Sequence, residues 1–142
     1  MKMKKSTDDL IKILKNKNSY DDFIRENSAS MDDRSLTESL ESLLVVNHIS
    51  KADAISHSNL QRNYAYQIFS GQRIPSRDKL IMLCIGMNAD QQQTSKLLLK
   101  IKAAPLYAKD ERDSIILFGL MHHISVIDIN ILLYEHHLKC LE

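Results

Sequence analysis

The chain has 142 residues, 44% of them hydrophobic and 26% charged, which is typical of a globular protein with one buried core. Its three Gly and two Pro are too few for the many tight turns of an all-β chain, and its two distant cysteines, Cys84 and Cys140, give no indication of a disulfide framework. The start has no signal peptide and no apolar run reaches about 18 residues, so we expect a cytoplasmic protein without a membrane partner.

The first 34 residues predict a small N-terminal helical arm. Ser6 or Thr7 can cap a first helix with acidic residues in its first turn, and "NSYDDFIREN" indicates a short second helix capped by Ser19. The polar run "SASMDD", residues 28–33, is interpreted as a linker. We therefore place a boundary at residue 34.

Residues 35–103 predict five helices separated by short connections. Ser50, Ser76 and Asp90 are expected caps, while Asn59 and Gly71 suit left-handed backbone after a helix. The second and third helices are short and joined by a tight turn, which is the helix-turn-helix arrangement. The expected ranges are about 35–48, 50–57, 61–70, 77–87 and 90–102.

Residues 104–142 predict a helical hairpin packed on this domain. One helix is expected over about 110–122 and the last one begins at Ser125, with only "HHIS" between them. Arg112 and Asp113 are expected in an ion pair or a helix cap. The hairpin is expected to brace the preceding domain or to form a homodimer through Ile127 and Ile131.

The distribution of charge is more informative than the net charge of +1. Residues 50–79 carry five basic side chains against two acidic ones, whereas the segments on either side are each slightly acidic. A local basic patch is what phosphate binding requires. The same region holds three aromatic residues, of which Tyr64 and Phe69 are expected in the core or an interface and Tyr66 is expected to be exposed.

The stretch "ISKADAISHSNLQRNYAYQIFSGQRIPSRDKLIMLCIGMNAD" resembles the five-helix DNA-binding domain of phage repressors, the lambda-repressor-like or XRE-like family. A short helix, a turn, a second helix, a Gly, basic residues, Pro-Ser and a Leu-rich helix follow in the family's order. Nearly all of the chain after residue 36 is also similar to small bacterial helix-turn-helix proteins of unassigned function. The resemblance implies an all-α fold with a lambda-repressor-like five-helix domain.

The resemblance also implies that the chain is a transcriptional regulator and that its partner is double-stranded DNA. The helix at about 61–70 would read the major groove, where Arg can bond guanine and Asn or Gln can bond adenine. The residues after Gly71 would lie along backbone phosphates. The implied DNA-binding residues are Lys51, Gln61, Arg62, Asn63, Tyr66, Gln67, Gln72, Arg73, Ser76 and Arg77.

An enzyme or a metal protein is not expected. The pairs His122–His123 and His136–His137 suggest metal ligands, but neighbouring residues on a helix point about 100° apart and no third ligand has zinc spacing. No glycine-rich phosphate loop or Gly-flanked serine nucleophile is present. We therefore predict no cofactor and no metal. The alternative to DNA binding is a helix-turn-helix scaffold whose aromatic helix binds a protein partner.

Overall fold

A computed structural model describes residues 5–16, 19–27 and 34–142. Every regular element in these ranges is an α-helix, so the predicted all-α class is confirmed. The chain divides into two compact units, Met1–Arg34 and Ser35–Glu142. The linker predicted at residues 28–33 lies outside the described residues.

The N-terminal unit contains helices α1 (Thr7–Lys15) and α2 (Tyr20–Asn27). The Ser6 hydroxyl accepts a hydrogen bond from the amide of Asp9 at 3.1 Å, and Ser19 caps α2 in the same way. Phe23 is buried, and the Asn27 side chain donates to its carbonyl oxygen at 2.9 Å. No residue of α1 is buried, so the described part of this unit has only a very small hydrophobic core.

The larger unit contains the seven helices expected after residue 34. Their ends differ from the sequence-based ranges by no more than two residues, because Ser35, Ser50, Ser76, Asp90 and Ser125 each cap a helix with a side-chain oxygen. The helices are α3 (Leu36–Val46), α4 (Lys51–His57), α5 (Arg62–Ser70), α6 (Arg77–Gly86), α7 (Gln91–Lys100), α8 (Glu111–Met121) and α9 (Val126–Glu135).

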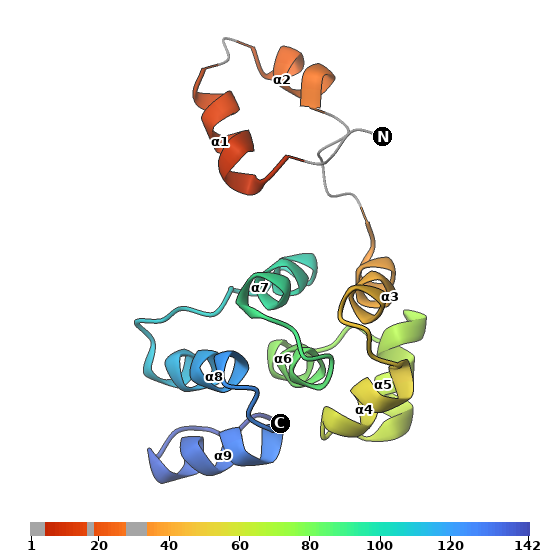
Figure 1. Cartoon of the computed structure of the whole chain (residues 1–142), viewed down its shortest axis with the longest axis vertical. Helices are drawn as coiled ribbons and strands as arrows, with labels where there is room; N and C mark the ends of the chain where they lie inside the picture. Colours follow the sequence, from red (N-terminus) through yellow and green to blue (C-terminus); the bar gives the residue numbers. More distant parts are fainter. Residues whose placement is uncertain (1–4, 17–18, 28–33) are drawn as a thin grey trace. The chain divides into compact units, whose positions relative to one another are not determined.

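Helix α6 is the centre of this unit (Figure 1). All residues from Leu80 to Cys84 are buried, as expected of a helix that is covered on every side. Helix α4 packs closely on α6 because Gly86 has no side chain: a Cβ there would lie 2.2 Å from the carbonyl oxygen of Ala54. Helices α8 and α9 contact each other, and in addition α8 contacts α7 and α9 contacts α6. The C-terminal hairpin therefore shares one core with α3–α7.

Most helices of this unit end on a residue with left-handed backbone that is not glycine. His48 has φ 54°, and the amide of the next residue, Ile49, donates to the carbonyl of Leu44 at 3.1 Å. The same pairing recurs after α6, α7, α8 and α9, each time with an apolar residue following the left-handed one. Of the two left-handed positions expected from the sequence, Asn59 has φ 59° and Gly71 has φ 85°, so both are confirmed.

Candidate nucleic-acid interface

The turn between α4 and α5 is fixed by its own side chains. The Ser58 hydroxyl donates to the carbonyl of Ile55 at 2.7 Å and accepts from the amide of Leu60 at 3.2 Å. Gln61 is the N-cap of α5, and its side-chain oxygen accepts from the amide of Tyr64 at 2.8 Å. The angle between the two short helices is therefore held by buried or capping hydrogen bonds.

Each aromatic ring of α5 has a basic side chain over it. Phe69 is 4% exposed, and Tyr64 and Tyr66 are partly buried against the core. The sequence predicts an exposed Tyr66. This prediction is wrong, because Tyr66 is partly buried and packs against the core. The contacts, measured from the cation to the ring centroid, are Lys51–Phe69 at 5.2 Å, Arg62–Tyr66 at 5.7 Å, Arg73–Tyr64 at 5.6 Å and Lys79–Tyr64 at 5.3 Å.

These contacts give the aromatic residues a different role from the one that a protein-binding patch would require. Phe69 is buried and the two Tyr rings are half-buried, and the charged ends of Lys and Arg lie over all three rings. Tyr64, Tyr66 and Phe69 are not among the large apolar side chains that are exposed in the described part of the chain. The aromatic rings instead limit where the cations lie.

The turn after α5 is tied back to that helix through Arg73. Its Nε donates to the Oε1 of Gln67 at 2.5 Å, and its amide donates to the Gln67 carbonyl at 3.2 Å. Gln67 therefore positions Arg73 in this structure. Lys51 is also paired, with Glu41 at 2.5 Å. Arg62, Asn63 and Gln72 are exposed on the surface.

Two surface hollows lie along this face and share Tyr66. One has a volume of about 300 Å³ and is lined by Lys51, Gln67 and Gln72 among others. The second, of about 770 Å³, is lined by the α4 side chain Asp53 and by Gln61 and Arg62. Six of the predicted DNA-binding residues thus line neighbouring depressions of α4 and α5: Lys51, Gln61, Arg62, Tyr66, Gln67 and Gln72.

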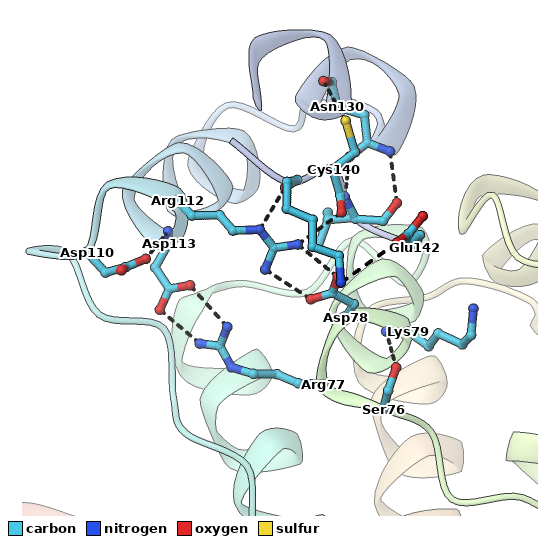
Figure 2. Close-up of polar contacts among 12 residues, drawn as sticks. Ser76, Arg77, Asp78, Lys79, Asp110, Arg112, Asp113, Asn130, Cys140 and Glu142 are labelled. Atoms are coloured by element: carbon cyan, nitrogen blue, oxygen red, sulfur yellow. Dashed lines mark hydrogen bonds and ion pairs between the residues drawn. The ribbon is translucent and has the colours of Figure 1, made fainter. Parts of the chain in front are cut away.

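Ser76 and Arg77 mark the edge of this group. Ser76 caps α6 by accepting from the amide of Lys79 at 3.3 Å. The guanidinium of Arg77 points the other way, toward α8, where its Nη1 and Nη2 donate to the two oxygens of Asp113 at 3.1 and 2.9 Å (Figure 2). It also donates to the carbonyls of Ala104 and Pro105. The expectation that Arg77 lies along a DNA phosphate is corrected, because four hydrogen bonds within the chain already occupy its guanidinium.

A second ion pair joins the same two helices with the roles exchanged: its arginine lies on α8 and its aspartate on α6. Arg112 donates to both oxygens of Asp78 at 3.0 and 2.8 Å, and also to the carbonyls of Lys139 and Cys140 (Figure 2). The Asn130 side chain then pairs with both backbone groups of Leu141. Two Arg-Asp dipeptides, one opening α6 and one in the first turn of α8, thus bind each other reciprocally.

Lys79 is the residue of this face that the sequence did not single out. It lies over Tyr64 together with Arg73, on the first turn of α6. A signal was present in the charge count, since Lys79 is one of the five basic residues in 50–79. Its place was not evident because helical spacing relates it to α6 and says nothing of a ring on α5.

The histidine pairs and the helix lengths add little to this site. Among the described residues, no three His, Cys, Asp or Glu side chains lie close enough to hold a metal ion. The His122 ring contacts that of Phe118 at a tilt of 41°, and the Nδ1 of His123 is 2.7 Å from the side-chain amide oxygen of Asn88. In the part of the chain that the structure describes, no helix combines the length and the apolar character needed to cross a bilayer.

Compared with protein-family models, curated proteins and solved structures, the chain matches none significantly.

Proposed function

We propose that the protein is a DNA-binding transcriptional regulator, with α3–α7 as a lambda-repressor-like domain and α5 as the helix that enters the major groove. The observation that carries the proposal is the set of four basic side chains held over the aromatic rings of α5. Cations that are ordered before binding lose less side-chain freedom when they meet a row of phosphates.

The exposed polar side chains of α5 supply groups that can read bases. Arg62 and Asn63 lie exposed in its first turn, where a helix entering the groove contacts base edges. Arg73 and Lys79 would then meet the backbone, together with the capped N-terminus of α6 at Ser76. The protein acts in this proposal as a binding protein without catalysis, cofactor or metal.

A homodimer fits the same proposal. Ile127, Ile131 and Tyr134 follow one another at helical spacing on α9 and are 59%, 50% and 76% exposed. A two-fold dimer through this stripe would double the contacts on a palindromic site. Binding of a protein partner by the aromatic residues of α5 is less well supported, since cations cover those rings.

The test is fluorescence anisotropy with a random duplex and with the region upstream of the protein's own gene, at two salt concentrations. Arg62→Ala should remove the preference for one sequence, and Arg73→Ala should weaken binding to both duplexes by about tenfold. Lys109→Ala is the control, because Lys109 is also an exposed cation and lies on the connection between α7 and α8. Binding that is absent at low salt, or equally weakened by Lys109→Ala, would reject the proposal.

A further inference from the structure

A cavity of about 520 Å³ lies within the larger unit, away from the aromatic face of α5. It is formed where the end of α4, the end of α6 and the turn between α8 and α9 come together. The Nδ1 of His123 and the Oδ1 of Asn88, 2.7 Å apart, join the α8–α9 turn to the end of α6 at its wall. Its volume is within the range of pockets that bind small organic molecules, about 300–1,000 Å³.

The wall chemistry restricts what could bind. Apolar groups come from α6, α8 and α9, with Ile85, Leu120 and Val126 among them. The polar side chains are hydrogen-bonding groups, among them Ser56 and His57 at the end of α4 and Asn59 in the turn after it. Among the described residues that line the cavity there is no Asp, Glu, Lys or Arg. An apolar molecule therefore meets matching surface, and a polar head group meets donors without a competing carboxylate.

The first residues of α9 add to this preference for an acceptor. Val126 and Ile127 line the cavity, and the first backbone bond of this helix is the one from the amide of Ile129 to the carbonyl of Ser125 at 2.9 Å. Of the amides before it, that of Asp128 donates to the Ser125 hydroxyl at 3.1 Å, and those of Val126 and Ile127 lie at the positive end of the helix dipole. The helix dipole at this end favours a negatively charged head group over a positive one.

We propose that this cavity binds a small apolar carboxylate. Its hydrophobic body lies against the apolar wall from α6, α8 and α9, and its carboxylate faces the end of α4 and the start of α9. The occupied cavity also touches Asn59, the left-handed residue of the turn between α4 and α5. An effect of the carboxylate on DNA binding rests on the proposed function, whereas binding of the carboxylate does not.

The experiment is isothermal titration calorimetry of the full chain, without DNA, using three probes of one shape. These are 4-phenylbutyrate, its uncharged amide and the amine 4-phenylbutan-1-amine. We expect one carboxylate per chain, bound at least about tenfold more tightly than the amine. A carboxylate that binds no better than the amine, or only above about 10 mM, would overturn the proposal.

Two variants locate the site. Ser56→Leu adds bulk to an exposed position of the lining and should weaken the carboxylate at least about tenfold. Ile127→Glu, at the start of α9, should reverse the preference so that the amine binds more tightly. Ile131→Glu makes the same change one turn along α9, outside the lining, and should leave both affinities unchanged.

The matched pair also separates the cavity from the apolar stripe of α9. Ile127 and Ile131 share that stripe, so a loss caused by a disrupted dimer would appear in both variants. Equal effects of Ile127→Glu and Ile131→Glu would therefore count against the cavity. Because no DNA is present, the outcome is independent of whether the protein reads DNA.

Discussion

Arg77 and Asp113 are 36 positions apart in the chain and are joined by two parallel hydrogen bonds, at 3.1 and 2.9 Å. Asp113 is 8% exposed and the Arg77 side chain 26% exposed, so the pair is largely removed from water. The amide of Tyr107 also donates to Asp113, at 3.0 Å. The carboxylate therefore fixes the start of α6, the connection before α8 and α8 itself relative to one another.

Replacing Asp113 with Ala should lower the free energy of unfolding by about 3 kcal/mol, because a largely buried guanidinium loses its partner. Chemical denaturation measures the change. Glu111→Ala is the control, since Glu111 is an exposed acid in the same helical turn and should change stability by less than about 0.5 kcal/mol. Equal losses in the two variants would show that the pair contributes nothing of its own.

Tyr64 should matter for affinity toward DNA although it contacts no base in the proposal. Tyr64→Leu keeps an apolar side chain against the core but removes the ring that lies under both Arg73 and Lys79. We expect affinity for a random duplex to fall about threefold to tenfold, with the salt dependence nearly unchanged because the charges remain. Anisotropy at two salt concentrations measures both. An unchanged affinity would mean that the rings do not organise the cations.

The close contact between α4 and α6 predicts a strong effect of a single methyl group. Gly86→Ala would place its Cβ 2.2 Å from a backbone oxygen, which cannot rotate away, so we expect a loss of about 3 kcal/mol in the free energy of unfolding. In Gly119→Ala the new Cβ would meet only the Ile129 side chain, at 2.3 Å. A side chain can shift more easily than a backbone oxygen, so the loss in thermal or chemical unfolding should be smaller. The reverse order would contradict the stated cause.

The left-handed residue after α3 offers a stabilising substitution. His48→Gly removes a side chain from a residue with φ 54° and should raise the free energy of unfolding by about 1 kcal/mol. His57→Gly is the matched control, because the same change within α4 should be destabilising by a similar amount. Thermal melts distinguish the two, and a loss of stability in His48→Gly would refute the prediction.

Cys84 predicts a pH dependence of stability. Burial raises the pKa of the Cys84 thiol to about 12. Above about pH 9 the thiol of the unfolded chain loses its proton while the folded chain keeps it, so the contribution of Cys84 to stability falls as the pH rises through this interval. The stability difference between wild type and Cys84→Ala should therefore be about 1 kcal/mol smaller at pH 10 than at pH 7, measured by urea unfolding. A constant difference would argue against a buried, protonated thiol.

The sequence predicted the helices well because their signals are local. A capping serine or aspartate such as Ser76 or Asp90 lies next to the helix that it begins, and Asn59 and Gly71 mark helix ends by their own backbone preferences. The expectations of Arg77 on a phosphate and of an exposed Tyr66 failed for the opposite reason. Burial of Tyr66 and the pairing of Arg77 with Asp113 depend on residues distant in the chain, which periodicity does not relate to each other.

The central position of α6 has a consequence for dividing the protein into pieces. Its buried residues from Leu80 to Cys84 are covered by α4 and α7 and, from the C-terminal hairpin, by α9. A fragment ending at residue 103 would expose part of that surface to water and leave Arg77 and Asp78 without their partners. We expect such a fragment to aggregate, so attempts to isolate α3–α7 should keep the hairpin attached.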